Sequence, residues 1–144
     1  MSIEELKAKI LRAEEEAWLK GNVDVMNEFC APDVVLHMYP FPDIKGLEAA
    51  KQGVLVQLQA YSNMHWDTEE MIGEGNTIVL RYTLYMKHTG TSLNMPIPPT
   101  GKELVMKGCD VFHLKDGKVI EMFGYRDYLG MLQQLGVAPS MGKK

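Results

Sequence analysis

The sequence predicts an α+β domain in which helices cover one face of a curved antiparallel sheet. Apolar residues recur at helical spacing in much of residues 1–61, and from residue 65 onward the period changes to two. The chain has 144 residues, which suits one domain with a sizeable core, so we expect a single domain over 1–144. A long sheet curls, and helices that close one side of it can leave a cone with an internal apolar cavity.

Three helices are expected in the first part of the chain. Ser2-Ile3-Glu4-Glu5 fits a capping box, in which the Ser2 hydroxyl accepts the Glu5 amide. The helix that follows ends at Gly21-Asn22. A short helix is expected from Val23 to Cys30, and Gly46 opens a second long helix. The apolar stripe of the first helix consists of Leu6, Ile10, Leu11, Ala13, Ala17 and Trp18.

Strands are expected where β-branched, aromatic and polar residues alternate. The first covers 34–39 and stops at Pro40. Asp116-Gly117 is a strong hairpin signal between the last two strands, and a helical segment, 128–135, follows them. Segment 89–101, rich in proline and glycine, is expected to be an irregular surface loop. The later strands are expected at 65–74, 77–88, 102–114 and 118–126.

Composition excludes several function classes. The net charge is −4 and the only basic run is Lys143-Lys144, so a nucleic-acid partner is not expected. No apolar stretch approaches the roughly 20 residues that span a bilayer, and the charged N-terminus does not resemble a signal peptide. Cys30 and Cys109 form no CxxC pair and are interpreted as buried thiols of a cytoplasmic protein. The histidines show no HxH or HExxH spacing, so no metal site is predicted.

Several sequence blocks occur in a recognisable order. They are PDVVLH at 32–37, HTG at 88–90, IPPTGK at 97–102, DVF at 110–112, DGKVIE at 116–121 and DYLGMLQQLG at 127–136. Together they resemble the SnoaL-like polyketide cyclase (ester cyclase) family, whose fold is similar to nuclear transport factor 2: a curved sheet wrapped by three helices. The resemblance implies a cofactor-free enzyme that closes a polyketide-like ring by intramolecular aldol condensation of a carbonyl compound.

The resemblance also implies catalytic residues. Asp127 would be the general acid/base, and His113 on the preceding strand would assist it. Because side chains alternate along a strand, Phe123 and Tyr125 share one side with Asp127 and would give it apolar neighbours facing inward. Such burial would make the carboxylate a stronger base. A second interpretation, compatible with the first, is that Asp127 is the N-cap of the segment beginning at Tyr128.

Further side chains are candidate substrate contacts. Trp66 would form either an aromatic wall for a planar ligand or part of the core. Arg81 needs an acidic partner if it is buried, with Asp127 or Asp110 as candidates, and otherwise marks an exposed face. His88 fits either the rim of the site or a hydrogen-bonded position in the core. The complete set of expected contacts is Met38, Trp66, Arg81, His88, Phe123 and Tyr125.

Epoxide hydrolases of the limonene type provide an alternative enzyme function. VVLHMYPFP at 34–42 and YRDYL at 125–129 also resemble that family. Two of the positions that hold the attacking water there are Leu36 and Met38 here, and these side chains cannot position water. Only Arg81 and Asp127 of its catalytic set are kept, which argues against this reaction.

Two more alternatives stay open. A ketosteroid-isomerase-like proton shuttle would need a donor to the enolate oxygen, such as Tyr39, Tyr82 or Tyr125. A non-enzymatic member would bind an apolar or aromatic small molecule or serve mainly as a homodimer, formed through the exposed side of the sheet. An enzyme predicts an enclosed cavity lined by Asp127 and at least one of His113, Arg81 or a tyrosine.

Overall fold

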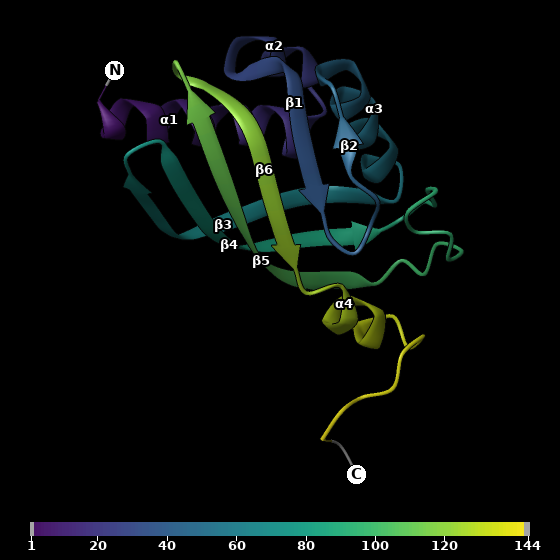
Figure 1. Ribbon diagram of the computed structural model, residues 1–144. Helices are drawn as coiled ribbons and strands as arrows, with labels where there is room; N and C mark the ends of the chain where they lie inside the picture. The colour runs from purple at the N-terminus through teal and green to yellow at the C-terminus, as the bar shows by residue number, and fades with distance from the viewer. Residues whose placement is uncertain (1, 143–144) are drawn as a thin grey trace.

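Six strands form one curved sheet in the computed structural model, which describes residues 2–142 (Figure 1). The order across the sheet is β2-β1-β6-β5-β4-β3. All neighbouring strands are antiparallel except β1 and β6, which are parallel. The strands are β1 (Cys30–Met38), β2 (Ile44–Lys45), β3 (Tyr61–Glu74), β4 (Thr77–His88), β5 (Glu103–Lys115) and β6 (Lys118–Arg126).

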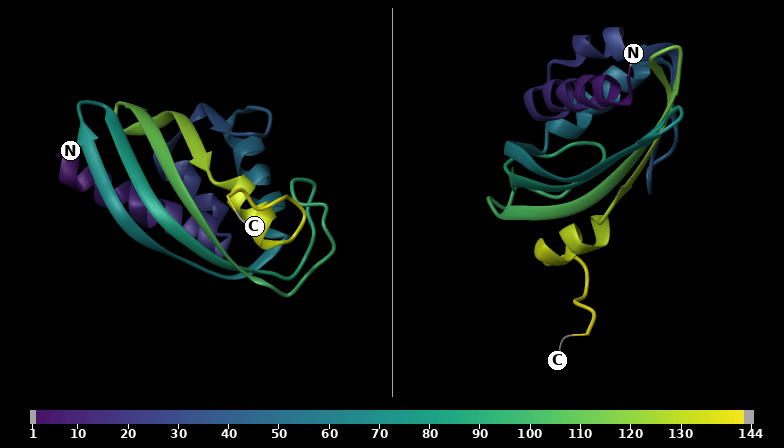
Figure 2. Two further views of the ribbon diagram at one scale, coloured as in Figure 1. Left: turned by 90° about the horizontal axis from the view of Figure 1, so that it is seen from below. Right: turned by 90° about the vertical axis from the view of Figure 1, so that its left-hand side faces the viewer.

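The first three α-helices lie together on one side of the sheet, and the fourth lies at the end of β6 (Figures 1 and 2). A π-helical turn, Glu15–Leu19, extends the first helix, and a 3₁₀ turn, Val23–Val25, precedes the second. None of the helices within residues 2–142 is long and apolar enough to cross a bilayer. The α-helices are α1 (Ile3–Glu14), α2 (Met26–Phe29), α3 (Leu47–Leu58) and α4 (Tyr128–Gln134). This arrangement confirms the predicted α+β cone.

Local sequence signals account for the ends of these elements. The Ser2 hydroxyl accepts the Glu5 amide at 3.1 Å, as the capping box predicts. Gly46 precedes α3 with φ at 96°, a conformation that favours glycine. Asp116 and Gly117 both have positive φ, as a two-residue hairpin turn between β5 and β6 requires.

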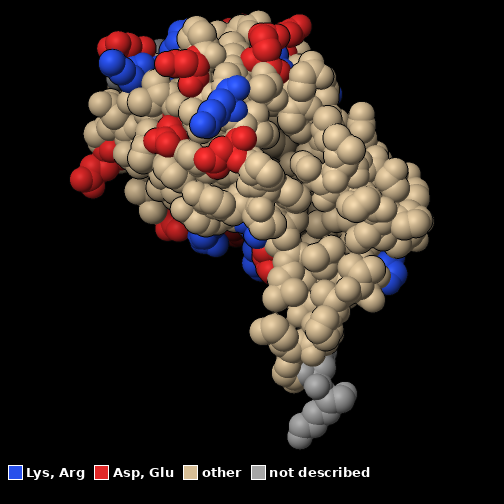
Figure 3. Space-filling model, turned by 45° about the vertical axis from the view of Figure 1, so that its right-hand side comes forward, with Lys and Arg blue, Asp and Glu red and all other residues tan. Residues whose placement is uncertain are grey.

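Segments 89–101 and 128–142 contain no charged residue, and the lower and right-hand surface in Figure 3 is largely uncharged.

The sheet has an inner face that packs against α1–α3 and an outer face that they leave open. On β4, even-numbered residues from Ile78 to His88 are buried, and on β5 the same holds from Leu104 to Leu114. On β6 the inward residues are Met122, Gly124 and Arg126. The odd-numbered residues of these strands therefore lie on the outer face, except Val119, which is buried and precedes a shift in the β5–β6 register. The prediction that Phe123 and Tyr125 face the interior is wrong, because the buried phase of β6 is the other one.

The strands agree with the predictions where the signal is local. β4 and β6 have the predicted bounds, whereas β3 begins at Tyr61 and β1 at Cys30, earlier than expected. Neither the two-residue β2 nor the parallel β1–β6 pairing was predicted. Parallel partners are far apart in sequence, so their pairing leaves no short-range signature of the kind that a hairpin turn provides.

Candidate active site

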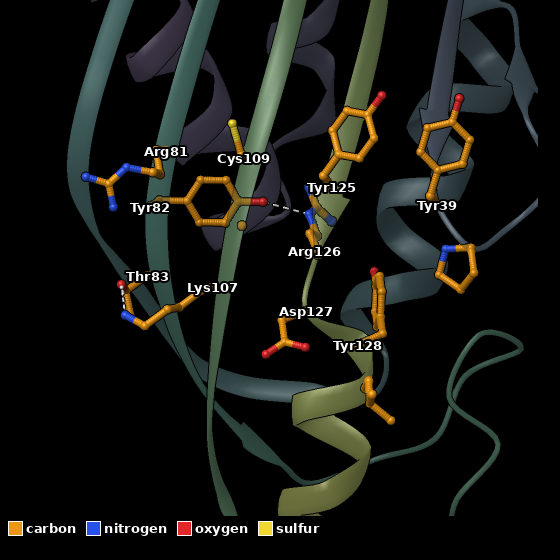
Figure 4. A pocket seen from close by; sticks show the side chains of 13 residues that line it. Tyr39, Arg81, Tyr82, Thr83, Lys107, Cys109, Tyr125, Arg126, Asp127 and Tyr128 are labelled. Atoms are coloured by element: carbon orange, nitrogen blue, oxygen red, sulfur yellow. Dashed lines mark hydrogen bonds between the residues drawn. The ribbon is translucent and has the colours of Figure 1, made fainter. Parts of the chain in front are cut away.

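Asp127 lies at the junction of β6 and α4, where it is the N-cap of α4. Its Oδ1 accepts the Gly130 amide at 2.9 Å, and the missing Cβ of Gly130 makes room for the carboxylate. The residue is exposed and borders an open groove of about 660 Å³, called the outer groove here (Figure 4). Outward side chains such as Arg81, Lys107 and Tyr125 line this groove, and the inward residues Tyr82 and Arg126 also border it. The expected apolar hollow around Asp127 is therefore wrong, and the capping interpretation is confirmed.

His113 does not reach Asp127. It lies on the outer face with 43% of its side chain exposed, and its Nδ1 is 3.8 Å from Glu121 Oε1. The Asp127 amide donates to the carbonyl of Lys107, which is 113 − 107 = 6 positions along β5 from His113. At about 3.4 Å per residue, the two backbones are ~20 Å apart. A direct acid/base pair of these two residues has no geometric support.

The outer face carries three more of the candidates. Arg81 donates from Nε to Glu70 Oε1 at 3.2 Å and is exposed, so the exposed-face interpretation of Arg81 is confirmed. Tyr125 is 52% exposed, next to Tyr39. Phe123 stacks on His37 with ring centroids 4.5 Å apart. Arg81 and Tyr125 border the outer groove.

The interior holds the other three candidates. Met38 is buried on the inner face of β1, close to Gly124. Trp66 borders a small cavity, and its buried Nε1 donor has no partner among the described residues. His88 is fully buried at the end of β4, where its Nδ1 accepts the Thr100 amide, and it borders none of the cavities found among residues 2–142. Of the predicted contacts, Trp66 is therefore the one best placed to meet a ligand inside the cone.

Three polar side chains that were not predicted to act together meet on the inner face of the sheet, in what we call the Asp110 cluster. Tyr82 donates its hydroxyl to Asp110 Oδ1 at 3.3 Å. Arg126 Nε donates to the Tyr82 oxygen at 2.7 Å, the bond drawn between these two residues in Figure 4. Arg126 is also 3.5 Å from Asp110 Oδ2, and its guanidinium lies 4.7 Å from the ring centroid of Trp18. The side chains of Arg126 and Asp110 are 5% and 3% exposed.

Two glycines make this cluster possible. A Cβ at Gly108 would lie 2.6 Å from the phenol end of Tyr82, so only glycine lets the ring cross β5 towards Arg126. A Cβ at Gly124 would lie 3.3 Å from Asp110 Oδ1. Both glycines are inward positions on strands whose other inward side chains are large. Their small size is therefore what leaves room for the three polar groups.

Burial governs the electrostatics of the cluster. It raises the pKa of Asp110, and the nearby Arg126 guanidinium opposes this by favouring the carboxylate. Burial also raises the pKa of Tyr82 well above its usual range, so the phenol stays neutral. Burial disfavours the charge on Arg126, but the oxygens of Tyr82 and Asp110 outweigh this and hold its pKa well above the ordinary value. The cluster thus combines a basic carboxylate, a permanent cation and a neutral donor.

Two small enclosed cavities lie beside these residues. The inner cavity is bordered by Arg126, Tyr82, Trp66 and Trp18, and the Glu14 cavity by Glu14, Trp18 and otherwise mainly apolar side chains. Each has a volume of about 10 Å³, which is room for about one water molecule. The interior therefore contains two small cavities, and Asp127 borders neither of them. No group of three His, Cys, Asp or Glu side chains within residues 2–142 converges in the manner of a metal site.

The sequence contained a signal for the missed residues. Asp110 stands in phase with the apolar positions of β5, between Met106 and Phe112. Glu14 likewise falls in the apolar stripe of the first helix, four residues after Ile10 and four before Trp18. A charged residue at a position that the pattern assigns to the core is the observation that would have found both.

Comparisons with known proteins place this chain in a family. The family model for SnoaL-like polyketide cyclase matches residues 8–135. The chain therefore belongs to the SnoaL-like polyketide cyclase family. Among curated proteins it is similar to aklanonic acid methyl ester cyclase DnrD of Streptomyces peucetius, with 28% identity over 88% of each chain. It is also similar to aklanonic acid methyl ester cyclase DauD of Streptomyces sp. strain C5, with 26% identity over 88% of this chain and 80% of that one.

Solved structures agree with this assignment. A protein from Jannaschia sp. CCS1, described as a SnoaL-like polyketide cyclase, superposes with a TM-score of 0.85 at 25% identity, covering 97% of this chain and 98% of that one. An epoxide hydrolase from M. tuberculosis shares the fold with a TM-score of 0.69 at 15% identity, over 92% and 90% of the two chains. Arg81 and Asp127, the residues kept from the limonene-type pattern, lie on the outer face here.

Proposed function

We propose that this protein is a cofactor-independent enzyme that transfers protons on a carbonyl compound, in an intramolecular aldol closure or a related isomerisation. The observation that carries the proposal is the Asp110 cluster, buried beneath the sheet and bordering the inner cavity through Tyr82 and Arg126. Family membership and the likeness to two aklanonic acid methyl ester cyclases support this reaction class.

The chemistry follows from the order of the hydrogen bonds. Asp110 does not border the inner cavity, but the Tyr82 hydroxyl donates to it. Tyr82 would take a proton from the carbon next to a substrate carbonyl while its own proton passes to Asp110. The remaining N–H groups of Arg126 would stabilise the enolate oxygen. The electron pair of the broken C–H bond then forms the new C–C bond as the π bond of the receiving carbonyl breaks. The oxygen of that carbonyl gains one proton in place of the one removed from carbon, so the closure is an isomerisation that needs no redox partner.

Two effects of known size would contribute to the rate at such a site. Holding both reacting ends together contributes roughly 7–11 kcal/mol, and general acid/base catalysis contributes about 10²–10⁴-fold in rate. A general base works best when its pKa lies near the working pH. Burial raises the pKa of Asp110 and so brings it closer to that pH. A planar or cyclic carbonyl compound suits the aromatic lining, and the unpaired Trp66 Nε1 would donate to one of its oxygens.

Substrate entry requires side chains to move, because the inner cavity holds only about 10 Å³ in this structure. A drug-sized ligand occupies a pocket of about 300–1,000 Å³. Met64 and Leu58 border the cavity, and methionine is the side chain that adapts most readily to a new shape. We therefore expect the bound enzyme to differ from this structure mainly in the side chains around Trp18.

The test uses two probes with the purified protein. Aklanonic acid methyl ester reports ring closure as a product of unchanged mass and altered retention, and α-tetralone in D₂O reports proton removal as deuterium uptake. We expect turnover of at least one probe, and a loss of about 10²-fold or more for Asp110→Asn. No turnover of either probe by the parent protein would refute the proposal.

The same assay decides the role of Asp127 and His113. Their predicted acid/base function stays a prediction, and it is the alternative to the Asp110 cluster. If the cluster is the site, Asp127→Asn and His113→Asn should keep the parent rate. Loss of activity in Asp127→Asn with parent activity in Asp110→Asn would move the chemistry to the outer groove.

A non-enzymatic role is the second candidate, because the closed interior favours it. In that case the protein would be a homodimer or would hold a small apolar ligand. The exposed Tyr39, Val105 and Tyr125 on the outer face suit pairing of two chains through their sheets. Sedimentation of the parent and of Tyr125→Glu tests this: we expect a dimer that the charge weakens. A cytoplasmic location is also expected, and fractionation of the source cells would check it.

A further inference from the structure

Glu14 is a buried acid that the proposed chemistry has not used. It is the last residue of α1, directly before the π-helical turn, and only 4% of it is exposed. Ile10, Glu14 and Trp18 follow each other at four-residue spacing and are all buried against the sheet. π-helical turns associated with α-helices occur frequently at functional sites. The four-residue spacing places the Glu14 carboxyl in the interior, although burial of an apolar side chain there would cost less free energy.

The surroundings of the Glu14 carboxyl are apolar. Phe29, Leu36 and Phe112 are among the residues that border its cavity, and the one nearby thiol is that of Cys30. Among residues 2–142, no side chain forms a hydrogen bond or a salt bridge with this carboxyl. A buried charge without a partner is strongly unfavourable, so the neutral acid is the stable form.

The charged neighbours of Glu14 lie on the facing strands. Burial raises the pKa of Glu14 to about 8, with Asp110 on β5 adding to the rise and Arg126 on β6 opposing it. Cys30 is no competing acid, because burial and the neighbouring Glu14 raise its pKa to about 12. Glu14 is therefore a carboxylic acid that keeps its proton at neutral pH and can donate it, in contrast to an exposed glutamate.

One side chain borders the cavities of both Glu14 and the Asp110 cluster. Trp18 borders both the Glu14 cavity and the inner cavity, and the Arg126 guanidinium lies over its ring. Movement of Trp18 would join the two cavities into one chamber with a proton acceptor on one wall and a proton donor on the other. A ligand that enters the inner cavity must displace side chains there, and Trp18 is common to both spaces.

We propose that Glu14 is the general acid of this site, which protonates the carbonyl oxygen of the substrate while Tyr82 and Asp110 take the carbon-bound proton. This inference rests on the proposed function. In an aldol closure the C–H electron pair forms the C–C bond, the receiving carbonyl oxygen gains the Glu14 proton, and Asp110 ends protonated. Return of one proton from Asp110 to Glu14, directly or through solvent, restores both groups. The sum is an isomerisation with no atom gained or lost.

The test compares Glu14→Gln and Glu14→Asp with the matched control Glu15→Gln, using deuterium uptake by α-tetralone. Glutamine keeps the shape but cannot give up a proton, so we expect a fall of about 10²-fold or more. Aspartate keeps the acid on a shorter arm and should recover part of the rate. The parent rate should fall above about pH 8 as Glu14 ionises, and Glu14→Gln should lack this fall. The control should follow the parent.

Outcomes separate this inference from the proposed function. Parent-like rate and pH profile in Glu14→Gln, with Asp110→Asn inactive, would overturn the role of Glu14 alone. A parent protein that turns over neither probe would overturn both. Where the parent closes the ring of the first probe without deuterium uptake, the same variants are compared by ring closure. A substrate-free measurement adds a second check: the carboxyl carbon of Glu14, followed by NMR, should titrate near pH 8. A midpoint below about pH 5, the range of an exposed glutamate, would also overturn the inference.

Discussion

Replacing Glu14 by glutamine should make the free energy of unfolding less sensitive to a rise in pH between 4.5 and about 8. Burial raises the pKa of Glu14 from 4.5 to about 8. Between these values the folded protein holds the Glu14 proton and the unfolded chain does not, so the free energy of unfolding falls as pH rises, and it levels off above about pH 8. At about 1.4 kcal/mol per pKa unit, a shift of about 8 − 4.5 = 3.5 units corresponds to a loss of up to roughly 5 kcal/mol.

The assay is urea unfolding of the parent and of Glu14→Gln at a series of pH values from 5 to 9. The difference in free energy of unfolding should be small near pH 5 and should grow in favour of the variant by several kcal/mol towards pH 9. Water that enters the Glu14 cavity would solvate the carboxylate and reduce this difference, so roughly 5 kcal/mol is an upper limit. Glu15→Gln makes the same chemical change at a less buried position and should show no such growth. If the free energy of unfolding changed with pH equally in the parent and in Glu14→Gln, the Glu14 carboxyl would not be desolvated as described.

The remaining predictions concern the Asp110 cluster and the helix cap. Arg126→Met should lower the free energy of unfolding by about 3–5 kcal/mol at neutral pH, because it leaves Asp110 buried without its cation. The further change of Asp110 to Asn in that variant should restore part of the loss, and no recovery in urea unfolding would contradict the ion pair. Asp127→Ala should cost about 1 kcal/mol through the lost bond to the Gly130 amide, whereas Asp127→Asn should cost little. Equal melting temperatures for the two variants would show that the cap does not stabilise α4.

The candidate site could be predicted in part, and the errors share one cause. The resemblance implied Asp127 as the acid/base, and the aromatic residues before it were interpreted as its inward neighbours. Aromatic residues are also common on exposed strand faces, and Tyr125 is 52% exposed. The phase of β6 up to Asp127 is decided by Met122 and Gly124, which are buried on the inner face. A shift of one residue turns every side chain of a strand to the other face. The choice of Phe123 and Tyr125 as inward residues therefore also placed Asp127 on the wrong side.

The sequence alone determined the elements whose signals are local. The Ser2 capping box, the Asp116-Gly117 turn and the bounds of β4 and β6 depend on residues that are neighbours along the chain. Its ordered motif blocks also indicated the family. Tertiary structure decided which acids are desolvated: Glu14 comes from α1, Asp110 from β5 and Arg126 from β6, far apart in sequence. The proton affinity of each group depends on the water removed and the charges brought near by packing, and neither is a property of a short stretch of chain.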